Sequence, residues 1–145
     1  RNFVGENEFF EPYDSLRFMF ENKSDDDLVI YKNIASLGHP FEKACRRILL
    51  SDALFTNTDR HMRNFGVIRS SLTGEILRMA PNFDNNQAYR ANPGGRFSDA
   101  ILRSFKASFG LTKEDIEDLK ALIDACRKNS YLAAAAEIGE EFLNH

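Results

Sequence analysis

The sequence has only two cysteines and no long apolar run, and each of these shortages excludes a class of protein. Cys45 and Cys126 are too few and too far apart for a disulfide-bonded secreted scaffold. No histidine clusters with either of them as a zinc site would require. Apolar runs such as 132–136 are far shorter than the about 20 residues of a membrane span. We therefore expect a cytoplasmic protein without a membrane segment, whose cysteines are reduced core residues.

An excess of positive charge is also missing. The chain carries 19 basic and 22 acidic residues, for a formal net charge of −3. A protein that binds nucleic acid directly usually has a basic face and a high isoelectric point. The charge balance therefore argues against direct contact with nucleic acid.

The residues that are present predict one packed, mainly helical domain over 1–145. Apolar residues make up 43% of the chain, and 13 of them are phenylalanine, which buries a large area without a polar atom. Helical spacing or capping signals predict helices, and alternation around a glycine-containing turn predicts a β-hairpin. The expected elements are a short helix from Ser15 as its cap to Phe20, a loop over 21–27, a helix from Phe41 to near Asn57, hairpin strands over 64–69 and 75–79, and helices over 98–110, 113–126 and 131–142. The fold class expected is thus mainly α (α+β), with helices around a single small hairpin.

The segment 57–86 carries the residues best suited to chemistry. Asp59 and Asn64 fall in a loop between the expected helix and the hairpin, and Asp84 follows the hairpin's second strand. Because a hairpin brings its two ends together, Asn64 and Asp84 are expected to approach each other. Carboxylate and amide oxygens are ligands that Mg²⁺ accepts alongside water and phosphate. Asp59 would supply a second carboxylate that accepts a proton from a substrate hydroxyl, as in phosphoryl transfer.

At these residues the chain resembles the C-terminal catalytic lobe of HipA-like Ser/Thr protein kinases. The resemblance rests on 59–64 (DRHMRN), a short hairpin, and 80–84 (APNFD), which match the family's Asp-x-x-x-x-Asn, hairpin and Pro-x-x-Asp order. Phosphatidylinositol kinases have a similar Asp-Arg-His-x-x-Asn string, but the Ala-Pro-x-x-Asp ending favours the HipA-like group. The matching segment covers about 30 residues, and the two motifs together are more specific than either alone.

The resemblance implies a kinase-like C-terminal lobe that uses ATP and Mg²⁺. It implies that Asp59 is the catalytic base, that Asn64 contacts metal and phosphate, and that Asp84 is the principal metal ligand. His61 would hold the catalytic loop by hydrogen bonding. HipA-like kinases often belong to toxin–antitoxin systems, so a protein substrate or an antitoxin-like partner is implied as well.

Several interpretations of this segment remain open at this point. No glycine-rich loop or strand lysine of a nucleotide-binding lobe precedes Asp59, so we expect a C-lobe cut from a longer kinase and inactive by itself. A non-catalytic remnant that binds a partner protein through its helices is the rival hypothesis, and a lipid or small-molecule kinase also survives. In a purely structural interpretation, Asp59 and Asn64 would only cap helices or turns.

Overall fold

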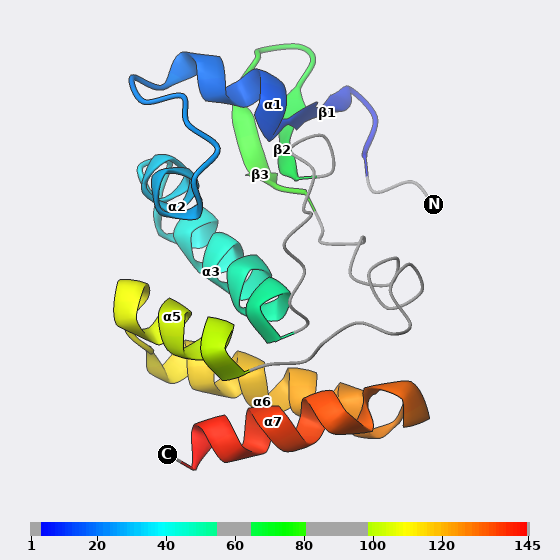
Figure 1. Ribbon diagram of the computed structural model, residues 1–145. Helices are drawn as coiled ribbons and strands as arrows, with labels where there is room; N and C mark the ends of the chain where they lie inside the picture. Colours follow the sequence, from blue (N-terminus) through cyan, green and yellow to red (C-terminus); the bar gives the residue numbers. More distant parts are fainter. Residues whose placement is uncertain (1–3, 55–64, 81–98, 145) are drawn as a thin grey trace. The chain divides into compact units, whose positions relative to one another are not determined.

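The computed structural model describes residues 4–54, 65–80 and 99–144, and in them the protein is mainly helical with one small antiparallel sheet (Figure 1). The elements are β1 (Glu8–Pro12), α1 (Tyr13–Leu16), the 3₁₀ helix η1 (Arg17–Met19), α2 (Asp27–Ala35), α3 (His39–Leu54), β2 (Gly66–Ser70), β3 (Ile76–Met79), α5 (Asp99–Phe109), α6 (Lys113–Arg127), the 3₁₀ helix η2 (Ser130–Leu132) and α7 (Ala133–Leu143). Within these ranges no helix is both long and apolar enough to cross a membrane. The predicted mainly helical class is confirmed, and the predicted hairpin is present as two strands of a three-stranded sheet.

The described residues fall into two compact units, and the division lies within α3. The first unit holds 4–45 and 65–80, and the second holds 46–54 and 99–144. The first unit contains the three-stranded sheet in the order β1-β2-β3, with both pairs antiparallel. Its core includes Tyr13, Ile34 and Ile68, all fully buried.

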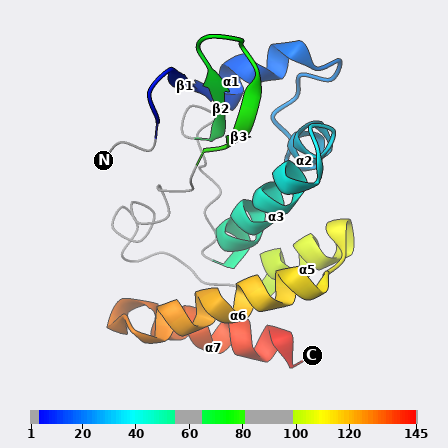
Figure 2. The same cartoon turned by 180° about the vertical axis from the view of Figure 1, so that it is seen from behind.

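The second unit is a helical layer in which α6 and α7 lie side by side and antiparallel, joined through η2, as both views show (Figures 1 and 2). Leu102, Leu119 and Ile123 provide buried apolar side chains of its core. Gly139 permits the close approach of the two helices, because a Cβ there would lie 2.7 Å from Cγ1 of Ile123. The predicted helices of this region are confirmed, with bounds that differ by one or two residues.

The capping box predicted for α6 is present. The Thr112 hydroxyl accepts a hydrogen bond from the Asp115 backbone N–H at 3.0 Å, and the Asp115 carboxylate accepts one from the Thr112 N–H at 2.9 Å. Both bonds satisfy backbone donors that the first turn of a helix otherwise leaves unpaired.

The first 35 residues depart most from the sequence-based prediction. Ser15 is not a helix cap: it lies inside α1, and its hydroxyl donates to a Glu11 carboxylate oxygen at 2.8 Å. The loop predicted over 21–27 is confirmed for 21–26, and it ends where Asp26 caps α2 by accepting from the Leu28 N–H at 2.8 Å. Strand β1 and helix α2 were both missed.

Both cysteines are free and buried, as predicted for reduced core residues. Burial raises the pKa of the Cys126 thiol to about 11, so this thiol stays protonated and unreactive at neutral pH.

A buried ion pair connects the middle of α3 to the start of α6. Arg46 and Asp115 are 7% and 3% exposed, and the guanidinium Nε of Arg46 lies 3.2 and 3.1 Å from the two carboxylate oxygens. The same guanidinium donates to the backbone carbonyls of Phe109 at 3.3 Å and Gly110 at 2.8 Å. Few donors of Arg46 are therefore left for water, and the turn between α5 and α6 depends on this side chain.

Replacing Asp115 with alanine is expected to lower the free energy of unfolding by about 3–5 kcal/mol, because it leaves a buried guanidinium without its counter-charge. Chemical denaturation measures this loss. The exposed Glu117 of α6 supplies a control, and Glu117→Ala should change stability by less than about 0.5 kcal/mol. An equal effect of the two substitutions would show that the pair does not stabilise the fold.

The same pair predicts how stability depends on pH. Burial by itself raises the pKa of Asp115, but hydrogen bonds from Arg46 and Thr112 outweigh burial and hold the pKa below its ordinary value. A carboxyl with a lowered folded pKa stabilises the protein above its unfolded pKa of about 4, and this contribution is lost as the pH falls through the folded pKa. Asp115→Asn should therefore flatten the acid side of the stability profile.

Candidate functional site

The residues proposed for chemistry from sequence lie outside the described part of the structure. Asp59, His61 and Asn64 fall in 55–64, and Asp84 falls in 81–98. Their expected convergence therefore stays a prediction. The structure describes the hairpin β2–β3, which lies between these two segments in the sequence.

The open end of the hairpin is closed by backbone pairing. Val67 pairs with Met79, and the Ala80 N–H donates to the Gly66 carbonyl at 2.9 Å. Along the sequence, Asn64 comes two residues before Gly66 and Asp84 comes four residues after Ala80. The predicted hairpin is confirmed, and its register pairs the residues from which the two motif-bearing segments continue.

Phe65, the residue directly after Asn64, is fixed through both its backbone and its side chain. Its carbonyl accepts a hydrogen bond from the Tyr13 N–H at 2.6 Å, and its ring is 5% exposed, with its centroid 5.9 Å from that of Tyr13. Tyr13 is itself fully buried and receives a 2.8 Å hydrogen bond from the Asn33 side-chain amide. Burial raises the pKa of Tyr13, so its hydroxyl stays neutral across the physiological range.

Strand β1 lies very close to its neighbour β2 at Gly66, which is paired with Pro12. A Cβ on Gly66 would lie 2.1 Å from the Glu11 carbonyl oxygen and 2.7 Å from the Pro12 Cα. Only glycine lets the two backbones approach this far. This close approach of the two strands was not predicted, although a glycine inside an apolar strand pattern is a signal of close backbone approach.

Two arginines of the hairpin pair with glutamates of β1. Arg69 contacts Glu11 at 2.6 Å, and Arg78 contacts Glu8 at 2.8 Å. The hydrogen bond from Arg78, together with the one from the Gly5 backbone, lowers the pKa of Glu8 to about 2, so Glu8 stays ionised at neutral pH. These two ion pairs therefore connect β1 to both strands of the hairpin.

Two polar side chains near the end of α3 are buried. Ser51 is 1% exposed and Asp52 is 8% exposed, and Asp52 lies seven positions before Asp59 in the sequence. Both lie in the last turn and a half of α3, and the apolar spacing that predicts this helix does not reveal that these two polar side chains are buried.

No group of three or more His, Cys, Asp or Glu side chains that could hold a metal occurs within 4–54, 65–80 and 99–144. Comparison of the chain with protein-family models, curated proteins and solved structures found no match.

Proposed function

We propose that this chain is the catalytic C-terminal lobe of a HipA-like kinase, which transfers the γ-phosphate of ATP to a Ser or Thr hydroxyl with Mg²⁺. Two features support the proposal: the motif order of Asp59, Asn64, hairpin and Asp84 in the sequence, and the register of the hairpin between them. The observation that carries it is the hydrogen bond from Ala80 to Gly66, because a hairpin open or slipped at that end would separate the two motifs.

In the proposed reaction, Asp59 orients the acceptor hydroxyl and takes its proton. The hydroxyl oxygen forms a bond to the γ-phosphorus while the bond from that phosphorus to the bridging oxygen of the β-phosphate breaks, and ADP leaves. Asn64 and Asp84 would hold Mg²⁺, whose charge neutralises the phosphate oxygens. Positioning and charge neutralisation account for most of the acceleration in such reactions.

The frame around Phe65 supports this division of roles. A residue that positions a metal or a phosphate must itself be held rigidly. Phe65 is anchored by Tyr13, and Ala80 is hydrogen-bonded to Gly66, so the chain is fixed one residue after Asn64 and four residues before Asp84.

Transfer of labelled phosphate from ATP by the natural protein that carries this chain tests the proposal. A mixture of bacterial proteins with exposed Ser and Thr can serve as acceptor, and autophosphorylation should be scored alongside. We expect incorporation that disappears when Mg²⁺ is removed by chelation. If no incorporation and no ATP binding are found, the kinase proposal is wrong, and the result favours the alternative of a kinase-like remnant that binds a partner protein.

A further inference from the structure

The hydroxyl of Tyr13 is held by a side chain from another helix. Tyr13, at the start of α1, is fully buried, and its phenol oxygen accepts a hydrogen bond from the side-chain amide of Asn33 in α2 at 2.8 Å. The same amide nitrogen donates to the backbone carbonyl of Asn22 at 2.9 Å. One amide group therefore connects α2 both to α1 and to the loop that follows η1.

Tyr13 contacts Phe65 through its backbone and through its ring. The Tyr13 N–H donates to the Phe65 carbonyl at 2.6 Å, and the two ring centroids lie 5.9 Å apart. The hydrogen bond from Asn33 therefore holds the far end of a side chain whose near end is bonded to Phe65. A buried hydroxyl that loses its partner is left unsatisfied, so removal of this bond is expected to shift the Tyr13 ring.

Phe65 directly follows Asn64 in the sequence, and Asn33, Tyr13 and Phe65 all belong to the first unit. A metal ligand binds well only when its supporting residues hold it within about 0.5 Å of the productive position. Removal of such a supporting hydrogen bond typically weakens metal binding by about 10- to 100-fold. The contacts from Asn33 to Phe65 are therefore suited to hold the chain where Asn64 begins.

We propose that Asn33 is a positioning residue of the phosphate-transfer site, which acts through Tyr13 and Phe65 on Asn64. This inference rests on the proposed function, because Asn33 has this role only if Asn64 binds metal and phosphate. Asn33 is not a catalytic residue, since it acts through Tyr13. A purely structural Asn33 would instead stabilise the first unit without a specific effect on metal binding.

Tyr13→Phe tests the proposal, because it removes the hydroxyl that Asn33 contacts and keeps the ring and the bond from Asn33 to Asn22. We expect the dissociation constant for Mn²⁺·ATP, measured on the natural protein by electron paramagnetic resonance, to rise about tenfold. The KM for the acceptor protein should not change, because Asn64 is proposed to contact metal and phosphate only. Asn33→Ala should weaken Mn²⁺·ATP binding at least as much.

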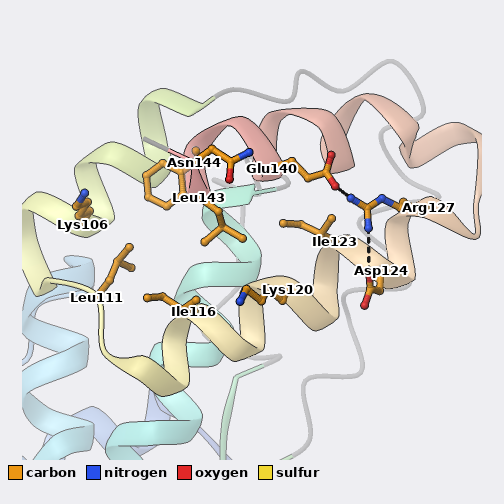
Figure 3. Close-up of a pocket in the computed structure, with 11 residues that line it drawn as sticks. Lys106, Leu111, Ile116, Lys120, Ile123, Asp124, Arg127, Glu140, Leu143 and Asn144 are labelled. Carbon is orange, nitrogen blue, oxygen red and sulfur yellow. Dashed lines mark hydrogen bonds and ion pairs between the residues drawn. The ribbon is translucent and has the colours of Figure 1, made fainter.

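Two substitutions control for a general loss of stability. Tyr31→Phe lies on the same helix α2 and removes a tyrosine hydroxyl that donates to Glu42 instead. Arg127→Gln removes the ion pair between α6 and Glu140 of α7 in the second unit (Figure 3). Both should leave the affinity for Mn²⁺·ATP unchanged, and chemical denaturation measures how much stability each variant loses.

Combination with Asn64→Ala shows whether the effect passes through Asn64. Once this ligand is removed, Tyr13→Phe should have no further effect on Mn²⁺·ATP binding, because the residue that it positions is gone. Hydrogen exchange of the Tyr13 amide reports on its bond to Phe65 without reference to activity, and Asn33→Ala should make this exchange faster.

The outcomes separate this inference from the proposed function. A wild type that neither binds Mn²⁺·ATP nor transfers phosphate would refute the proposed function and the role of Asn33 with it. An active wild type whose affinity is unchanged in Tyr13→Phe would refute the positioning role alone. An equal effect of Tyr31→Phe, additive effects with Asn64→Ala, or unchanged exchange of the Tyr13 amide in Asn33→Ala would also overturn it.

Discussion

Replacing Asp84 with alanine is expected to abolish Mg²⁺-dependent phosphate transfer in the natural protein while leaving its fold intact. Under the proposed function, Asp84 is the charged ligand of the metal that neutralises the phosphate oxygens. Loss of a few kcal/mol of transition-state stabilisation corresponds to a decrease in rate of about 1,000-fold or more. Initial rates with labelled ATP at saturating Mg²⁺ measure the effect.

Two further substitutions separate the roles of the proposed site residues. Asp59→Ala should lower the rate of transfer but leave the affinity for Mg²⁺ and ATP nearly unchanged, because Asp59 acts on the acceptor hydroxyl. Asp25→Ala removes an exposed carboxylate far along the sequence from both motifs and should have no effect. Activity that persists in Asp84→Ala would exclude Asp84 as the metal ligand.

Gly66→Ala is expected to give the largest loss of stability of any single methyl group added to the described part of the sheet. The new Cβ would meet the Glu11 carbonyl oxygen at 2.1 Å, and its nearest neighbours are all backbone atoms of Glu11 and Pro12, so no flexible side chain can move away. Strands β1 and β2 must therefore separate locally. We expect a decrease in the free energy of unfolding of about 3 kcal/mol, at the upper end of the usual cost of overpacking.

Gly74→Ala is the matched control for this prediction. Gly74 lies in the β2–β3 turn with φ +77° and nothing within 4 Å of a Cβ, so alanine there costs about 1 kcal/mol through backbone strain alone. Hydrogen exchange should show that Gly66→Ala lowers the protection of β1 and β2 amides more than that of α6 amides. Similar unfolding free energies for the two variants would mean that the close approach of β1 and β2 at Gly66 does not require a glycine.

Elements with a strong local signal were predictable from sequence. The apolar spacing of α3, α5 and α6 and the Thr112–Asp115 capping box each specify a helix within a few residues, and the turn at Gly74 specifies the hairpin. In these segments local preference and tertiary packing agree.

Strand β1 was not predictable in the same way, because its partner lies far along the chain. Glu8–Pro12 is a short segment whose pairing with Gly66–Ser70 spans almost 60 residues, and local periodicity carries no information on such a contact. Helix α2 is different: Asp26 followed by Ile30 and Ile34 is a readable start signal, which the acidic run around Asp26 obscured.

For the candidate site, the sequence supplies the residue types and their spacing, and the structure supplies the hairpin register that connects them. Asp59, Asn64 and Asp84 could be named from the motifs alone. The contact of Phe65 with Tyr13 and the close approach of the strands at Gly66 could not be predicted. Both depend on the segment around β1 and on backbone contacts that side-chain patterns do not encode.

The central claim is that Asn64 and Asp84 hold one metal ion together, and binding of Mn²⁺·ATP to the natural protein tests it most directly. Electron paramagnetic resonance of Mn²⁺ would give dissociation constants for the wild type, Asn64→Ala, Asp84→Ala and the double variant. We predict that each single substitution weakens binding and that the double variant loses much less binding free energy, relative to the wild type, than the sum of the two single losses. Fully additive effects, or no effect of either substitution, would contradict the account.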